Sequence, residues 1–270
     1  MIELLNRQQI LNLNKTFASF IIDWQEEQYN PELENNKSKA GLMYDIVLNK
    51  PRYYSQEEVD QMNAERLKEY NRKKDNIETI PIEEKYTGTI IYNLPYAEID
   101  DYAQSLAKSI VILSEKLGWE SVIYLPVYRM PWLGQQNDYK PVKRAINYLK
   151  SIGTTDDFAG GFKVNGTDLE KLLNNLFWIF RCNASLAYCF FSGIDRNFVG
   201  SICQYGNIHF HFYSHAEMID TKNAAIDLGM IQIEKCFENF SETGRIRGRR
   251  LDLGNEVKRQ RTKSWWRFWL

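Results

Sequence analysis

Three apolar stretches near the end of the chain, separated only by short turns, restrict the fold more than any other feature. Residues 185–192, 198–204 and 208–213 are rich in the aromatic and β-branched side chains typical of strands. Tyr205-Gly206-Asn207 joins the second stretch to the third and is typical of a tight hairpin. We therefore predict three consecutive antiparallel strands, because turns this short leave no room for a crossover connection.

The rest of the chain alternates between helical and strand patterns. Apolar spacing and capping residues predict helices over 7–28, 55–74, 96–117, 141–151, 167–181 and 216–238. Further strands are predicted over 89–92 and 122–128, and Pro126 favours a sheet edge or a bulge for the second. This order predicts an α/β fold of the α+β type. We expect a mixed sheet of about five strands that ends in the antiparallel meander and is covered by helices.

The domain organisation follows from the same change of pattern. We expect a principal α/β domain over residues 83–270. Residues 1–82 should form a helical N-terminal portion that packs on this domain or flanks it. At 270 residues with 44% hydrophobic side chains, the chain is long enough to bury a full-sized core.

Charge and cysteine usage predict a cytoplasmic protein. The formal net charge is −1, and no cationic start followed by an apolar run marks an export signal. The most apolar window, residues 172–191, is interrupted by Arg181 and three asparagines, so we predict no transmembrane segment. The four cysteines have apolar neighbours and form no CxxC pair, which favours buried free thiols in a reducing compartment: Cys182, Cys189, Cys203 and Cys236.

The three histidines of the chain lie within seven residues of one another, as His209, His211 and His215. The alternation of a strand puts His209 and His211 on one face, about 7 Å apart, where two imidazoles can share zinc or another transition metal. His215 follows the strand and could supply a third ligand. The alternative is structural: the two strand histidines form hydrogen bonds across the sheet, and His215 belongs to the cap of the next helix.

The C-terminal tail differs in charge from the rest of the chain. Residues 245–270 hold nine basic and two acidic side chains, a net +7, which leaves −8 for residues 1–244. Its end combines cations with tryptophans, a composition that suits a protein-docking surface, a membrane surface or single-stranded nucleic acid. The tail could instead pack back onto the domain. The candidate partner-binding residues are Arg261, Trp265, Trp266, Arg267 and Trp269.

No catalytic signature is present, so the sequence favours a binding protein without a cofactor over an enzyme. With an acidic body, 16 tyrosines and seven tryptophans, the chain resembles bacterial immunity and antitoxin proteins in general character. That resemblance implies an intracellular inhibitor whose protein partner is a secreted toxin. The first alternative is a metal-dependent hydrolase that uses His209, His211 and His215. The second is an accessory protein that binds a membrane or nucleic acid through its basic tail.

Overall fold

The computed structural model describes residues 1–45, 48, 50–77, 85–95, 99–134, 139–182, 186, 188–237 and 240. Its centre is an eight-stranded sheet in the order β1-β6-β5-β7-β8-β9-β4-β10. Every strand pair described in this sheet is antiparallel. The strands are β1 (Ile2–Leu5), β4 (Gly88–Asn93), β5 (Val122–Pro126), β6 (Gly161–Val164), β7 (Cys189–Gly193), β8 (Phe198–Ile202), β9 (Ile208–Phe212) and β10 (Ile231–Ile233).

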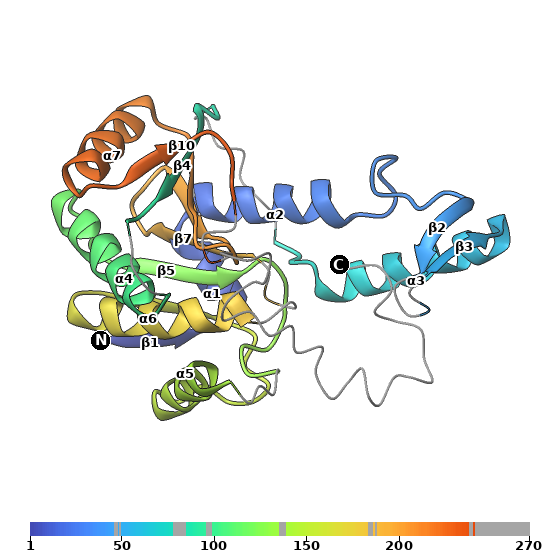
Figure 1. Cartoon of the computed structure of the whole chain (residues 1–270), viewed down its shortest axis with the longest axis horizontal. Coiled ribbons are helices and arrows are strands. Elements are labelled where there is room, and N and C mark those ends of the chain that lie inside the picture. The colour runs from blue at the N-terminus through green and yellow to red at the C-terminus, as the bar shows by residue number, and fades with distance from the viewer. Residues whose placement is uncertain are drawn as a thin grey trace.

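Helices cover both faces of the sheet (Figure 1). The described helices are α1 (Arg7–Leu13), α2 (Lys15–Tyr29), α3 (Gln56–Lys73), α4 (Ile99–Lys116), α5 (Lys140–Ser151), α6 (Thr167–Cys182) and α7 (His215–Asp227). On one face α4 packs against α6, with α5 beside α6 and α7 beside α4. On the other face, α1 lies over β5 and β6, and α2 lies over β8. The α/β class predicted from the sequence is confirmed.

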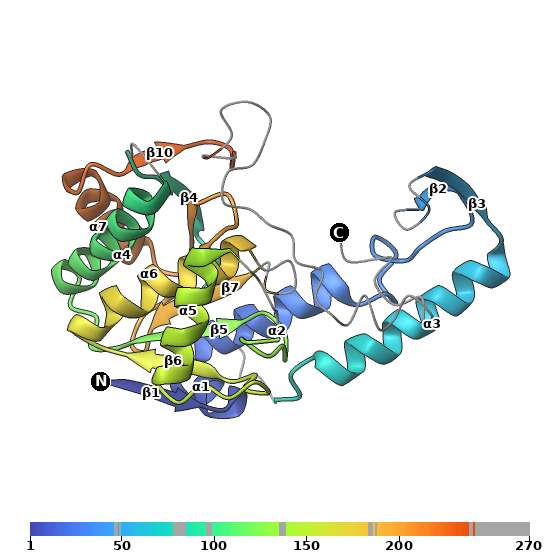
Figure 2. The same ribbon diagram turned by 60° about the horizontal axis from the view of Figure 1, so that its bottom comes forward.

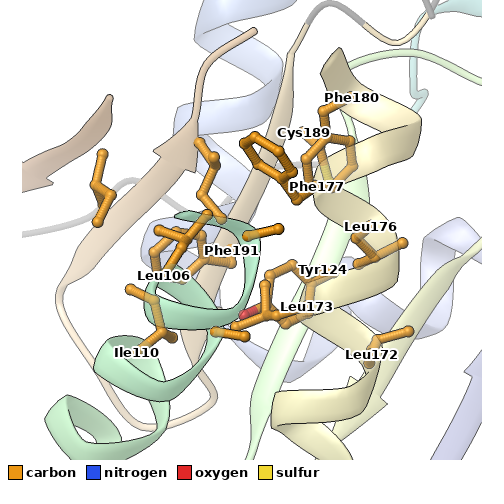
Figure 3. Close-up of a cluster of buried hydrophobic side chains, with 14 of the residues drawn as sticks. Leu106, Ile110, Tyr124, Leu172, Leu173, Leu176, Phe177, Phe180, Cys189 and Phe191 are labelled. Carbon is orange, nitrogen blue, oxygen red and sulfur yellow. The ribbon is translucent and has the colours of Figure 1, made fainter. Parts of the chain in front are cut away.

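The larger core fills the space between the sheet and the helices α4 and α6 (Figure 3). Leu106 of α4 and Leu173 of α6 are fully buried there, over Tyr124 and Phe191 of the sheet. Each aliphatic or aromatic side chain buried in this way contributes roughly 1.5–3 kcal/mol. Gly200 of β8 makes room for the Phe191 ring, because a Cβ atom at this position would lie 2.2 Å from it.

A second core lies under α1 and α2, and Asn14 sets the direction of these helices. The sequence predicts one helix over 7–28, but Asn14 separates α1 from α2. Its side-chain oxygen accepts a hydrogen bond from the Phe17 backbone nitrogen and so caps α2. Its amide nitrogen donates to the backbone oxygens of Gly193 and Arg196, each at 2.8 Å. The break therefore ties the start of α2 to the turn between β7 and β8.

Beyond the sheet, α2 continues into a projection that we call the arm, residues 30–75. Figures 1 and 2 show that α3 and a separate two-stranded hairpin, β2 (Gly41–Asp45) and β3 (Lys50–Tyr54), extend away from the sheet. The predicted capping box of Ser55 and Glu58 starts α3. Tyr70 of α3 donates a hydrogen bond of 2.5 Å to Glu26 of α2, so the helix of the arm is joined to α2.

A buried ion pair fixes the base of the arm. The Arg7 Nε atom donates to Asp75 at 2.7 Å, and Arg7 Nη2 donates to the second carboxylate oxygen at 2.6 Å. Gln25 of α2 donates to the same carboxylate at 2.9 Å. The remaining donors of Arg7 reach three backbone oxygens at the end of β5, those of Pro126, Val127 and Tyr128.

Three details of the fold differ from the sequence prediction. The sheet has eight strands in its described part rather than about five, because β1, β6 and β10 are short segments without a clear alternation. β5 lies between β6 and β7, so Pro126 marks the end of an interior strand and not a sheet edge. The helix predicted over 216–238 ends at Asp227, and Gly229, at φ +73°, leads into β10.

The boundary expected near residue 82 stays a prediction. The structure does show that the first residues of the chain belong to the main sheet, since Ile2–Leu5 pair with β6. None of the helices in the described residues combines the length and the apolar character that a bilayer span requires.

Candidate functional site

The two strand histidines share one face of β9, as the alternation predicts. Burial alternates along Ile208–Phe212, with both histidines half-buried and their neighbours fully buried. A ring nitrogen of His211 forms a 2.9 Å hydrogen bond with Thr89 of the adjacent strand β4. Its ring also lies 4.9 Å from that of Phe20 and 6.0 Å from that of Trp24, both on α2. His211 thus makes the cross-strand contact of the structural alternative.

Burial keeps the His211 side chain neutral. Desolvation, reinforced by the neighbouring His209, lowers the pKa of His211 to about 4. A neutral imidazole can act as a metal ligand, but this ring packs against the rings of Phe20 and Trp24 and is hydrogen-bonded to Thr89.

His215 lies apart from the sheet face. It is the exposed first residue of α7, whose cap is the side chain of Ser214, which accepts from the backbone nitrogen of Glu217. The Glu217 carboxylate accepts a 2.8 Å hydrogen bond from the Asn197 backbone nitrogen. The three histidines therefore do not form one compact set of ligands among the described residues.

His209 instead lies beside two cysteines. Among the described residues, one group of at least three potential ligand side chains has all its ligand atoms within 4.8 Å of one another: Cys203, His209 and Cys236. Cys203 directly follows β8, His209 lies in β9, and Cys236 follows β10. The Cys203 and Cys236 sulfur atoms are 3.5 Å apart. We call this group the Cys–His cluster.

The turn between β8 and β9 determines the shape of the Cys–His cluster. Gly206, at φ +83°, closes the turn, and its backbone nitrogen donates to the Cys203 oxygen at 2.9 Å. Asn207 is fully buried, and its amide nitrogen lies 3.1 Å from the Cys236 sulfur and 3.7 Å from the Cys203 sulfur. The same nitrogen donates to the Phe237 backbone oxygen at 2.7 Å. Asn207 thus holds the segment after β10 against the turn.

The electrostatics of the Cys–His cluster favour a thiolate. The hydrogen bond from Cys236 lowers the pKa of Cys203, and the nearby His209 lowers it further, whereas burial opposes the shift. The Nε2 atom of His209 is buried and has no hydrogen-bond partner. By contrast, burial raises the pKa of the fully enclosed Cys189 well above its ordinary value.

The cysteines correct one part of the sequence interpretation. Cys182 and Cys189 are buried, as their apolar neighbours predict, but Cys203 is only partly buried and Cys236 is exposed. Sequence reasoning missed Cys236 as a neighbour of His209 because it lies in a stretch predicted to be helical. The contact depends on β10 pairing with β4 at the edge of the sheet, and no local spacing encodes that pairing.

The second candidate surface is at the far end of the arm. Leu42 pairs with Tyr53, and Tyr44 pairs with Pro51, so their side chains share one face of the hairpin. The exposed fractions are 73% for Leu42, 59% for Tyr44 and 69% for Tyr53. We call these four residues the outer face of the hairpin.

The opposite face of the hairpin is packed against the start of α3. Tyr54 is buried, and its hydroxyl donates to the buried Asp45 carboxylate at 2.8 Å. The Arg52 guanidinium stacks on the Tyr54 ring at 4.6 Å and pairs with Glu58 of α3. The hairpin therefore has one face held in place and one face open to solvent.

The candidate residues of the C-terminal tail, Arg261, Trp265, Trp266, Arg267 and Trp269, lie outside the described residues. Comparison with known proteins adds no relative: no family model, no curated protein and no solved structure matches the chain. The Cys–His cluster and the outer face of the hairpin are therefore the two candidate sites among the described residues.

Proposed function

We propose that this chain is a binding protein that acts by occupying a protein partner, and that it contacts this partner with the outer face of the hairpin. One observation carries the proposal: Leu42, Tyr44 and Tyr53 are exposed together at the end of a projecting arm. Apolar side chains gathered on a projecting surface are typical of interaction sites. Tyrosine is also among the residues most enriched at binding hot spots.

The way the hairpin is held supports the same proposal. The hydrogen bond between Tyr54 and Asp45 joins the two strands of the hairpin, and the ion pair between Arg52 and Glu58 fixes its inner face to α3. A surface that is already ordered loses less conformational entropy when a partner binds. The arm thus presents a small apolar face in a defined orientation.

For the kind of partner, we propose a toxin that the chain inhibits, as immunity and antitoxin proteins do. Charge supports this proposal, since residues 1–244 carry a net −8 and a toxin directed at nucleic acid presents a basic surface. The metal-dependent hydrolase built on His209, His211 and His215 stays a prediction, as does a membrane or nucleic-acid role for the tail.

Site-specific photo-crosslinking in the cells that encode the chain tests the contact surface. A photoreactive amino acid at Tyr53 should trap one protein, and the same amino acid at Ile226, which is 56% exposed on α7, should not. Equal capture from both positions, or none from Tyr53, would contradict the proposal.

Reconstitution with the purified partner then measures the contribution of the outer face. The Leu42→Ser/Tyr53→Ser variant should bind at least about tenfold more weakly, because hot-spot side chains contribute 2 kcal/mol or more. The control variant Ile226→Ser/Ile231→Ser removes two apolar side chains of similar exposure from α7 and β10 and should bind like the wild type. A toxin partner should lose activity when the wild-type chain is added, and the outer-face variant should inhibit it less.

A further inference from the structure

We propose that Cys203, His209 and Cys236 bind one transition-metal ion, Zn²⁺ by the chemistry of the ligands, at the end of the β8–β9 hairpin. This site uses a different set of residues from the three histidines and shares only His209 with them. It does not depend on the partner-binding proposal, since none of its ligands belongs to the arm.

The spacing of the sulfur atoms supports a bridging ion. Two thiolates bound to tetrahedral zinc, each at about 2.3 Å, lie about 3.8 Å apart. The Cys203 and Cys236 sulfurs are 3.5 Å apart, close to this value and far from the roughly 2.05 Å of a disulfide. The ligand nitrogen of His209 lies within 4.8 Å of both sulfurs, so one ion can reach all three atoms.

The identity of the ligands selects the metal. Two thiolates and an imidazole are soft or borderline ligands, which favour Zn²⁺ and other late transition metals over Mg²⁺ and Ca²⁺. The His209 ring nitrogen beside the two sulfurs would supply the third ligand.

The surroundings of the sulfurs resemble the supporting shell of a metal site. Asn207 directs one amide nitrogen toward both sulfurs and toward the Phe237 backbone oxygen. Such outer contacts orient ligands and tune their affinity for the metal. Because Cys236 is exposed, solvent can reach this side of the cluster, and a water molecule could complete a four-coordinate zinc site.

A bound ion would join the residues after β10 to the turn between β8 and β9. β10 is an edge strand of three residues, held through its pairing with β4. A metal ion bound by both Cys236 and Cys203 would cross-link the segment after β10 to the end of β8. We therefore expect metal binding to stabilise the C-terminal side of the sheet.

Metal binding by the full chain tests the proposal directly. The purified protein is reduced, stripped of metal and shown to contain four titratable thiols. It should then bind one Zn²⁺ per chain in a titration with a chromophoric competitor. With Co²⁺ it should show thiolate-to-metal charge-transfer bands and the intense visible bands of tetrahedral coordination.

Matched variants assign the ligands. Cys236→Ser changes an exposed side chain, so it should fold normally but lose stoichiometric Zn²⁺ binding and the charge-transfer bands. The control Cys182→Ala removes a thiol outside the cluster and should bind one ion like the wild type. Asn207→Ala should weaken binding by about 10–100-fold, the usual effect of losing a supporting contact.

Two results would overturn the proposal. One is a fully reduced wild-type chain that binds less than one Zn²⁺ per molecule. The other is equal binding by Cys236→Ser and Cys182→Ala. A folding defect in any variant can be recognised by circular dichroism. The rate at which Cys236 is alkylated in the wild type gives a measurement without substitution, since Zn²⁺ should slow it.

Discussion

Replacing Asp75 with alanine tests whether the buried ion pair fixes the arm to the sheet. Arg7 and Asp75 are 5% and 8% exposed, so both charges lie out of water and depend on each other. Without the Asp75 carboxylate, the Arg7 guanidinium would stay buried with only backbone oxygens and no opposite charge. Gln25 would also lose the acceptor of one hydrogen bond.

The expected cost follows from the kind of interaction that is broken. Removing one partner of a buried, hydrogen-bonded ion pair destabilises a protein by about 3–5 kcal/mol. A native domain is stable by roughly 5–15 kcal/mol, so Asp75→Ala should remove a large part of the free energy of unfolding. With a urea dependence of about 3 kcal/mol/M, the midpoint should fall by about 1–2 M.

Urea unfolding followed by circular dichroism measures this shift. The control is Asp227→Ala, which breaks the exposed ion pair with Lys116 and should cost no more than about 1 kcal/mol. Should Asp75→Ala fail to accumulate, Gln25→Ala removes a neutral partner of the same carboxylate and should cost about 1–3 kcal/mol. Equal midpoints for Asp75→Ala and Asp227→Ala would refute the reasoning.

Three further predictions concern the core, a helix cap and pH. Gly200→Ala should lower the free energy of unfolding by about 1–3 kcal/mol, because its Cβ would meet the Phe191 ring at 2.2 Å, and Phe191→Leu in the same chain should restore part of the loss. Ser55→Ala should cost about 1 kcal/mol through the lost cap of α3, measured by the same unfolding assay. Burial alone would raise the pKa of Glu69, but Arg72 and the lysine beside it lower it to about 2. The folded state therefore holds this carboxylate in its charged form, so its contribution to stability should be lost as the pH falls from about 4.5 to about 2. Urea midpoints measured at several pH values should fall less over this range in Glu69→Gln than in the wild type.

The sequence correctly predicts those elements whose ends are determined by residues close to them in the chain. The helix over 55–74 is correct because Ser55 and Glu58 cap it and no tertiary contact is needed to define its start. The meander of β7, β8 and β9 is correct for a similar reason. The short turns between these segments leave one way for them to pair.

Elements that depend on distant partners could not be predicted. β1 is four residues that become a strand through pairing with β6, more than 150 positions away. The helix over 7–28 reads as continuous because apolar spacing does not reveal that Asn14 caps α2 while binding the β7–β8 turn. The same limitation hides the Cys–His cluster, since the sequence brings Cys203 and His209 together in one hairpin but gives no sign that Cys236 joins them.

The buried ion pair at the base of the arm should also affect partner binding, although it does not belong to the proposed contact surface. The two effects can be measured separately. The outer face of the hairpin is far along the chain from Arg7, but its orientation depends on α2 and α3. These helices are fixed by the Arg7–Asp75 pair and by the Tyr70–Glu26 hydrogen bond. A partner that binds a freely moving arm must order it first, and this ordering reduces affinity without any change in the contact surface. Asp75→Ala should therefore weaken partner binding in buffer without urea, where the variant is still folded. Binding by Asp75→Ala at the wild-type affinity would show that the outer face works without a fixed arm, and the preorganisation argument would then be wrong while the contact surface itself stands.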